Sequence, residues 1–298
     1  MTGTTTRAEA VTRVAPLGIR FWDVATGTPV RDGLRVACRP APGAASRVAG
    51  QSPSGTYVLR GLPGLGATER GDGSAEFWEH PPVSRSYLIE VTDGAGRYLQ
   101  VRFDAAGPVR GLFTPAYRFP GTAGSQPPVA VPLFSSSGRP VPPGMAVLRA
   151  QLARVPAASG PASWAVLEVV VPQGPSSFGV ADGNGAVTVL FPYPELLVLD
   201  PEAPASVSPP LSRQTWTLGL RAYLGAAPMV GPHGVPDLPA LLEQPQARPL
   251  ADPAGTLLSS VRLHYGRELV VRTSGDSHLL ISTDPVPLPP ADQGSPHA

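Results

Sequence analysis

The stretch TPVRDGLRV at residues 28–36 returns in a looser form as RPVPPGMAV at residues 139–147. Both copies read x-Pro-Val-x-x-Gly-(Leu/Met)-x-Val, which is a turn followed by the start of an apolar strand. A catalytic motif has no chemical reason to occur twice in one chain, whereas a duplicated domain repeats its turns and its strands. The pair therefore predicts that one fold occurs twice in this sequence.

Two further landmarks follow each copy in the same order. Gly55 of SGTYVL corresponds to Gly185 of NGAVTV, and Tyr87 of YLIEV corresponds to Trp216 of WTLGL. Short apolar runs between turn signals are typical of β-sandwiches and barrels. We therefore predict an all-β protein made of two tandem, immunoglobulin-like antiparallel β-sandwich domains.

Length and composition agree with this organisation. The chain of 298 residues is long enough for two cores, and its 39 Pro and 33 Gly disfavour long helices. The first domain is predicted over residues 18–134, with a linker-like stretch at 119–130, and the second over residues 135–285. A flexible polar tail is predicted for residues 1–17 and a disordered Pro-rich tail for residues 286–298.

The second domain is predicted to carry two additions. WAVLEVVV at residues 164–171 reads as an extra strand, and residues 228–253 read as a Pro-rich loop with one short helical turn near LPALL. In WTLGLRAYL, every second residue from Trp216 is apolar, which is the alternation of a half-buried strand. Trp164 and Trp216 are both expected in the core of this domain.

The order of these motifs resembles the carboxypeptidase regulatory-like, or transthyretin-like, seven-stranded sandwich. GLPG at residues 61–64 fits that family, whereas FPYP at residues 191–194 departs from it, as does Arg139 where the first copy has Thr28. The combination of FWDV, SPSGTYVLRGLPGL, PVPPGMAVLRA and VLFPYPE also resembles uncharacterised proteins of bacterial gene clusters for phage-tail-like contractile injection systems. These resemblances imply a structural or accessory role in a particle and transfer no catalytic residue.

Charge and cysteine content narrow the choice of partners. All 23 basic residues are Arg and the net charge is +1, so the sequence offers neither a phosphate-loop lysine nor a basic face for nucleic acid. Cys38 is the single cysteine, which rules out a disulfide framework, and we expect it to be a small buried hydrophobe. Without a signal peptide or an apolar membrane span in the sequence, we expect a cytoplasmic protein, or one carried in a particle that is later released; another export route stays open.

No constellation of residues predicts an enzyme. Gly-x-Ser-x-Gly is missing from the sequence, and Ser277 is adjacent to His278, which favours a plain turn. His264 and His278 with Glu268 form the one grouping worth testing for a metal, although a cross-strand polar pair explains them as well. DGNG at residues 182–185 is better explained as a hairpin turn than as part of a calcium loop. We predict no catalytic residue, no cofactor and no metal site.

Aromatic residues supply the candidate contact sites. Phe77 and Trp78 lie in EFWEHPP and are the residues most expected at a partner surface, although Trp78 could equally fold over the end of the sandwich. Trp22 alternates with Phe21, so one of these two rings must point away from the core. The alternative is that Trp22, Trp78 and Tyr117 form a platform for a sugar.

The sequence therefore favours a non-enzymatic structural or accessory protein that acts through contacts with other proteins. The particle of a contractile injection system is the setting that the resemblance implies. The alternative is a module that binds a glycan or a small ligand through exposed aromatic rings.

Overall fold

The structure is a computed structural model that describes residues 14–39, 45–71, 74–79, 83–116, 118–120, 130–156, 159–195, 210–225, 230 and 234–284. Strands dominate these ranges, so the prediction of an all-β fold is confirmed. In the described part of the chain no helix is long and apolar enough to cross a membrane. Residues 1–13 of the tail predicted for residues 1–17, and the whole tail predicted for residues 286–298, lie outside the described residues.

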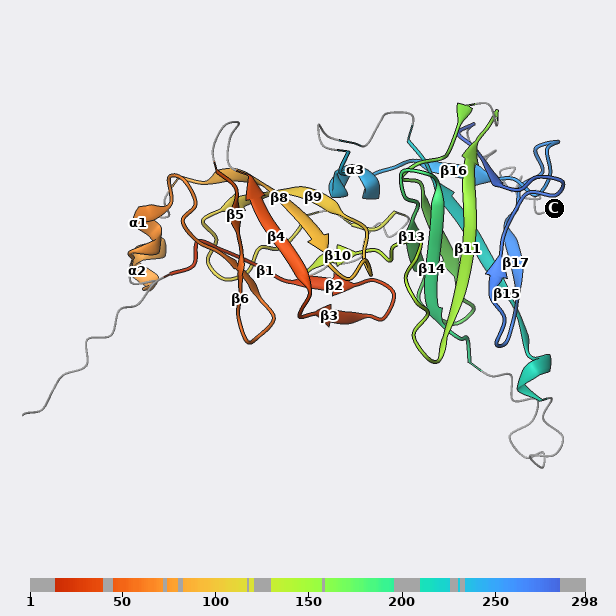
Figure 1. The fold of residues 1–298 in the computed structure, drawn as a ribbon, viewed down its shortest axis with the longest axis horizontal. Helices are drawn as coiled ribbons and strands as arrows, with labels where there is room; N and C mark the ends of the chain where they lie inside the picture. The colour runs from red at the N-terminus through yellow and green to blue at the C-terminus, as the bar shows by residue number, and fades with distance from the viewer. Residues whose placement is uncertain are drawn as a thin grey trace, which may run out of the picture.

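The strands form two units along the long axis of the molecule, an N-terminal unit with β1–β10 and a C-terminal unit with β11–β19 (Figure 1). The N-terminal unit holds three small sheets, with the orders β1-β7-β6, β10-β2-β3 and β5-β4-β8-β9. Helices α1 (Gly66–Glu69) and α2 (Ala75–Glu79) lie at its outer end (Figure 1). The strands are β1 (Leu17–Ile19), β2 (Phe21–Asp23), β3 (Thr28–Val30), β4 (Leu34–Arg39), β5 (Arg47–Val48), β6 (Gly50–Gln51), β7 (Tyr57–Leu59), β8 (Arg85–Asp93), β9 (Val101–Gly107) and β10 (Val131–Leu133).

The first strand pair shows how the chain moves from one sheet to another. β1 pairs with β7, and after Arg20 the chain continues as β2, which pairs with β3 and, in parallel, with β10. Phe21 is buried, whereas Trp22 keeps 37% of its surface exposed, so the predicted divergence of these two rings is confirmed. β1 begins at Leu17, which lies inside the tail predicted for residues 1–17 and is fully buried.

A β-hairpin forms the other side of the N-terminal core. β8 and β9 pair antiparallel, with Val91 opposite Val101, and in β9 every second residue is buried. Cys38 of β4 is completely buried, as expected, and burial raises the pKa of its thiol to about 11. It therefore packs as a small apolar side chain.

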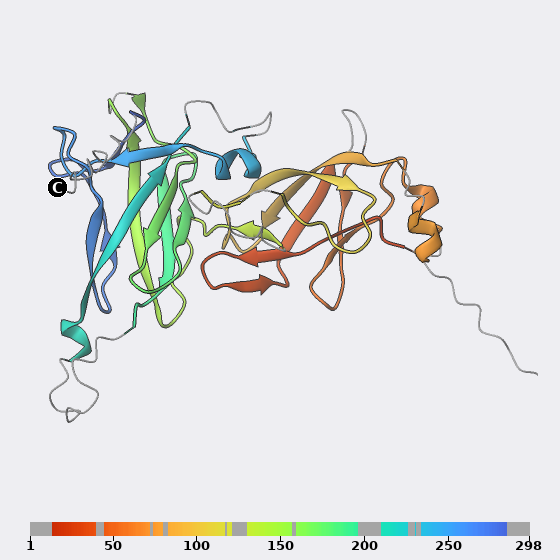
Figure 2. The same ribbon diagram turned by 180° about the vertical axis from the view of Figure 1, so that it is seen from behind.

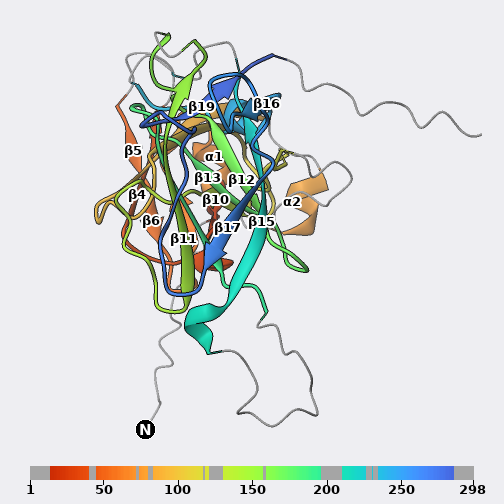
Figure 3. The ribbon, with the colours of Figure 1, turned by 90° about the vertical axis from the view of Figure 1, so that its right-hand side faces the viewer.

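The C-terminal unit is one nine-stranded sheet with the order β13-β12-β15-β16-β19-β11-β14, in which β17 also pairs with β15 and β18 with β11. Its long strands β11 and β15 are visible in the end view of Figure 3. Trp216, Leu218, Leu220 and Ala222 are buried on one face of β15, which confirms the predicted alternation. The strands are β11 (Met145–Arg154), β12 (Val166–Val170), β13 (Ser177–Val180), β14 (Ala186–Pro192), β15 (Thr215–Tyr223), β16 (Gln246–Pro249), β17 (Ser260–His264), β18 (Leu269–Val270) and β19 (Leu279–Ser282), with the 3-10 helix η2 (Leu211–Arg213) before β15.

The repeated motifs share turn geometry but not strand pairing. Gly33 and Gly144 have φ angles of +77° and +78°, and Gly55 and Gly185 have +76° and +86°, a region that favours glycine. The strands that follow the first pair of glycines nevertheless differ in their neighbours, since β4 lies between β5 and β8 whereas β11 lies between β14 and β19. Sheets of an antiparallel sandwich were expected throughout, yet β2–β10, β11–β18 and β11–β19 pair in parallel.

The Pro-rich segment predicted as a loop at residues 228–253 contains regular structure. The expected helical turn is present as α3 (Leu238–Leu242), which begins with the Asp237 carboxylate accepting a hydrogen bond from the Ala240 N–H at 3.3 Å. β16 lies in the same segment and was not expected. α3 packs against β9 of the N-terminal unit (Figure 2), where the Arg102 N–H donates to the Pro236 carbonyl at 3.0 Å.

Candidate functional site at the junction of the two units

The apolar core of the N-terminal unit continues into the C-terminal unit. One hydrophobic cluster contains Phe21, Ile89 and Phe103 together with residues of β12, β13, β15 and α3. Because the cluster is continuous across the junction, the two units are held as one body and not as beads on a linker. The C-terminal residues in it are Val166, Phe178, Val180, Tyr223, Leu238, Leu241 and Leu242.

The start of the predicted linker is part of this packing. The ring of Phe119 stacks on Phe178 of β13, with 4.9 Å between the ring centroids, and meets Phe134 edge-on at 5.9 Å. The start of the linker-like stretch is therefore packed against the core at Phe119, and its residues 121–129 lie outside the described residues. Trp164 also packs against this cluster while half-buried, so its predicted place in the second core is wrong.

A buried ion pair crosses the junction beside this core. The Arg139 guanidinium donates to both carboxylate oxygens of Asp23, with Nη1–Oδ1 at 3.0 Å and Nη2–Oδ2 at 2.6 Å. The Tyr98 hydroxyl donates to Asp23 Oδ2 at 3.1 Å, and the Arg139 guanidinium lies 4.9 Å from the centroid of the Tyr98 ring. Both charged side chains are more than nine-tenths buried, so each depends on the other for its solvation.

The electrostatics of this cluster follow from that geometry. Burial alone would raise the pKa of Asp23, but the hydrogen bonds and the positive charge of Arg139 outweigh it and hold this pKa below its usual value. Burial, with the Asp23 carboxylate close by, raises the pKa of Tyr98 to about 12. The cluster is therefore a charged pair with a neutral phenol at neutral pH, which suits a fixed connection and not proton transfer.

The sequence marks one residue of this ion pair, Arg139, as unusual, but it does not predict the ion pair itself. Arg139 occupies the position of Thr28 in the second copy of the motif, and this departure from the repeat was the available signal. Nothing in the sequence marks Asp23 or Tyr98 as part of this cluster, because a carboxylate at the end of a strand and a tyrosine after a turn are common.

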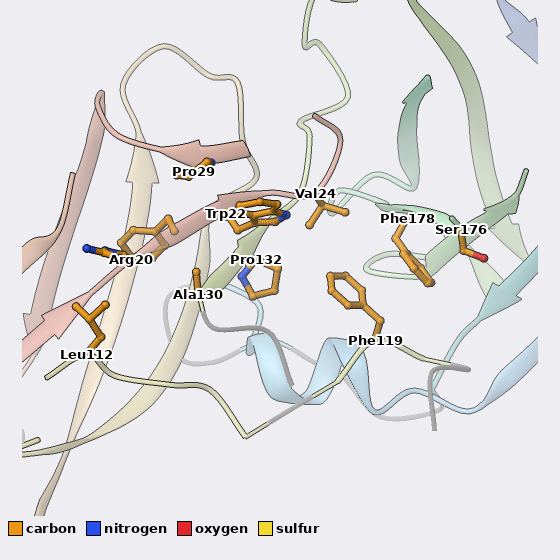
Figure 4. A pocket seen from close by; sticks show the side chains of 11 residues that line it. Arg20, Trp22, Val24, Pro29, Leu112, Phe119, Ala130, Pro132, Ser176 and Phe178 are labelled. Carbon is orange, nitrogen blue, oxygen red and sulfur yellow. The ribbon is translucent and has the colours of Figure 1, made fainter. Parts of the chain in front are cut away.

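A pocket of about 500 Å³ opens next to the ion pair, between the two units (Figure 4). Trp22 and Pro132 line it from the N-terminal unit, Ser176 and Phe178 line it from the C-terminal unit, and Phe119 closes it from the connecting segment. The lining is otherwise apolar, apart from Arg20 at one side. Such a volume and lining match the small-molecule sites of proteins, which span about 300–1,000 Å³.

The structure places the predicted contact residues in two separate places. Trp22 lies at the junction pocket, whereas Phe77 and Trp78 lie on α2 at the outer end of the N-terminal unit (Figure 1). Phe77 and Trp78 are half-buried and meet edge-on, with 5.2 Å between their centroids. Tyr117, the third ring of the suggested sugar platform, lies outside the described residues.

The grouping suggested for a metal does not assemble. His264 lies opposite Thr215 in the sheet, and Glu268 forms an ion pair with Arg149 at 3.1 Å. Across the described ranges, no three His, Cys, Asp or Glu side chains come together as a metal site would need. His80, His233 and His297 are outside those ranges.

The turn at residues 276–278 does not have the geometry of a catalytic triad. Ser277 Oγ and Asp276 Oδ1 both lie against the same ring nitrogen of His278, Nδ1, at 3.0 and 3.1 Å. A triad needs the serine and the carboxylate on opposite ring nitrogens. The hydrogen bonds of this segment instead stabilise the turn before β19.

No protein-family model and no curated protein sequence matches the chain. Among solved structures it is similar to the Bacillus anthracis TIE protein (9% identity, TM-score 0.23), covering 90% of this chain and 34% of that one. It is also similar to a Streptococcal ancillary pilin (10% identity, TM-score 0.22), with 90% of this chain covering 69% of that one. A third similar structure is a candidate adhesin from Bacteroides ovatus ATCC 8483 (10% identity, TM-score 0.21), with 96% of this chain covering 99% of that one. This chain thus spans about a third of the first of these proteins, and at such scores the likeness assigns no function.

Proposed function

We propose that this protein is a non-enzymatic structural or accessory component that acts through contacts with other proteins. The observation that carries the proposal is the aromatic pair on α2, at the outer end of the N-terminal unit. None of the five residues of this helix is buried, yet two of them are Phe77 and Trp78. Aromatic side chains that are left partly accessible in this way are enriched at protein interfaces.

The fixed junction supports a role as a scaffold. A core shared between the units and a buried ion pair keep α2 at a constant distance and direction from the C-terminal unit. A rigid body of this kind transmits position between two neighbours without losing conformational entropy on binding. This suits a protein that joins or spaces parts of an assembly.

The particle of a contractile injection system is the setting we propose for these contacts. This part of the proposal rests on the sequence motifs alone, namely FWDV, SPSGTYVLRGLPGL, PVPPGMAVLRA and VLFPYPE. A cytoplasmic location until the particle is released follows from the same assignment. A sugar platform that uses Trp22 and Trp78 together is less favoured, because these rings lie in different parts of the molecule (Figure 1).

The test is to recover the tagged protein from the organism that encodes it, with mass spectrometry of the co-purifying chains and negative-stain imaging of the eluate. Recovery of sheath, tube or baseplate proteins, with rods in the images, is the expected result. Trp78→Ala should reduce that recovery at least tenfold while the unfolding midpoint stays the same, because a buried aromatic anchor contributes about 2 kcal/mol or more to a protein interface. Trp22→Ala is the matched control, and a monomer without partners contradicts the proposal.

A further inference from the structure

The junction pocket adjoins a second, basic pocket. The second one has a volume of about 140 Å³ and is lined by Arg20, Arg31 and Ser54, among others. Arg20, Phe21 and Pro29 line both pockets, so the two adjoin at these residues, and together we call them the depression, with an apolar part and a cationic part. This combination is separate from the contact surface on α2.

The apolar part is built from aromatic rings. Trp22 and Phe178 face it from the two units, and Phe119, stacked on Phe178, forms its floor (Figure 4). Rings fixed by packing provide a flat surface for another flat or aliphatic group at small entropic cost. The apolar part therefore fits the body of an organic molecule.

The cationic part is held in place by short-range contacts. Arg20 Nε donates to Thr56 Oγ1 at 3.2 Å. Its guanidinium points away from Trp22 (Figure 4). The stem of Arg31 packs over Gly55, where an added Cβ would meet Arg31 Cγ at 2.9 Å, so a glycine is required for this approach. Arg20 and Arg31 thus line the same small pocket as Ser54, whose hydroxyl lies within hydrogen-bond distance of the Ser52 and Thr56 hydroxyls.

The charges around the depression favour an anion. Among the described residues that line either pocket, none is acidic. The two nearest carboxylates along the chain have other partners, since Asp23 is bound by Arg139 and Asp32 by Arg97 at 3.3 Å. An arginine pair without acidic neighbours attracts a carboxylate, sulfonate or phosphate group.

We propose that this depression binds a small anionic amphiphile, with its apolar body between Trp22 and Phe178 and its acidic group at Arg20 and Arg31. The volume suits a free small molecule, and the separation of the apolar and basic parts defines its polarity and orientation.

The test compares two dyes that share one body. The probe 1-anilinonaphthalene-8-sulfonate carries an acid, and N-phenyl-1-naphthylamine has the same rings without it. Titration into the full-length protein, followed by dye fluorescence and calorimetry, should give an affinity for the sulfonate about tenfold above that for the neutral dye. Equal affinities, or no binding of either dye, overturn the proposal.

Variants of the two arginines test where the acidic group of the dye binds. Arg20→Gln combined with Arg31→Gln should lower the affinity for the sulfonate about tenfold and leave the neutral dye within about twofold. Arg262→Gln, an exposed arginine on β17, is the matched control and should change neither affinity. If the double variant keeps the affinity of the wild type for the sulfonate, the acidic group does not sit where we propose.

A bulky side chain in the depression tests the apolar part. Ser176→Phe should weaken binding of both dyes at least tenfold, and Ala130→Trp provides a second route to the same block if the first variant fails to fold. An unchanged unfolding midpoint shows that the fold is intact. Dye binding that survives in a folded blocking variant places the dyes elsewhere and overturns the proposal. None of these outcomes depends on whether partners are recovered in the test of the proposed function.

Discussion

The two units reach stability by different routes. β11 and β15 of the C-terminal unit are ten and nine residues long and belong to one continuous ladder of nine strands. The N-terminal unit is divided among three sheets, and its strands β1, β2 and β3 have three residues each. Short strands provide few ladder hydrogen bonds, so more of the stability of this unit must come from side-chain packing.

The hydrophobic cores of the two units also differ, in whether they include residues of the other unit. Every residue of the C-terminal core, from Ala146 to Ile281, belongs to the C-terminal unit. The N-terminal core includes seven residues of the C-terminal unit. Three of them lie on α3, which packs against β9. The dependence therefore runs one way: the N-terminal unit needs its neighbour, whereas the C-terminal unit has a complete core of its own.

Separating the units gives the largest expected effect. A fragment of residues 135–284 should unfold cooperatively, with a midpoint near that of the C-terminal unit in the full chain. A fragment of residues 14–134 should show no cooperative transition, because it exposes the apolar surface that β13 and α3 cover. Circular dichroism and denaturant titration of both fragments measure this. A cooperative N-terminal fragment would falsify the one-way dependence.

Breaking the buried ion pair is the next largest perturbation. Arg139→Met leaves the Asp23 carboxylate buried without its cation, and removing one partner of a buried pair typically costs about 3–5 kcal/mol. The loss should appear in the unfolding of the N-terminal unit, monitored through a variant that keeps Trp22 as its only tryptophan.

The double variant Asp23→Asn with Arg139→Met serves as the control for Arg139→Met. It should recover part of that loss, since it removes both charges and leaves no carboxylate stranded. If the double variant is less stable than the wild type by the sum of the losses in Asp23→Asn and Arg139→Met, the pair is not coupled as the structure indicates.

Two leucines of equal burial distinguish the two cores. Leu241 of α3 and Leu218 of β15 are both fully buried, and truncation to alanine should cost about 2–5 kcal/mol at either site. Leu241→Ala should destabilise the N-terminal unit alone, although the residue belongs to the C-terminal chain segment. Leu218→Ala should lower the stability of both units.

Denaturant titrations with Trp22 and Trp216 as separate fluorescent reporters read the two units independently. The one-way dependence is contradicted if Leu241→Ala shifts the Trp216 transition as much as the Trp22 transition.

The elements that sequence analysis predicted are those whose pattern is local. β4, β8, β11, β14 and β15 follow from alternating apolar residues between glycine turns, and the turn at Gly185 from the DGNG signal. β13 (SFGV) and β16 (QARP) were missed because each has only four residues, with a Gly in one and a Pro in the other, and because their burial is decided by neighbours from distant parts of the chain. Trp164 was misplaced for a related reason, since a tryptophan at φ +65° before a strand gives no indication of which core it meets.

The packing between the two units could not be predicted from the sequence either, because it joins residues that are far apart in the chain. Asp23 and Arg139 are 116 residues apart, and Phe119 and Phe178 come from segments that read as linker and turn. A linker composition predicts independent domains, whereas the packing of a few aromatic rings joins them. The predicted contact residues on α2 and β2 could be named from sequence, but their separation in space depends on the fold.

Lowering the pH is expected to have the smallest effect among these tests of the difference in stability between the two units. The lowered pKa of Asp23 in the folded protein means that, as pH falls, the unfolded chain binds its proton first. The stability from this group is therefore present above the ordinary aspartate pKa of about 3.9 and is lost as pH falls through the folded-state value. The Asp93 pKa is also lowered, because the hydrogen bonds of Arg97 outweigh the opposing effect of burial, and it too belongs to the N-terminal unit.

As pH falls below about 4, the Trp22 transition should therefore shift to lower denaturant concentration while the Trp216 transition shifts less. Asp23→Asn should make the Trp22 transition less sensitive to pH in this range, and less stable above it. In the C-terminal unit hydrogen bonds from neighbouring residues lower the Asp252 and Asp276 pKa values as well, but both residues are only half-buried, at turns outside the buried core. Equal acid sensitivity of both reporters in the wild type, unaltered by Asp23→Asn, would mean that the junction ion pair does not set the weaker stability of the N-terminal unit.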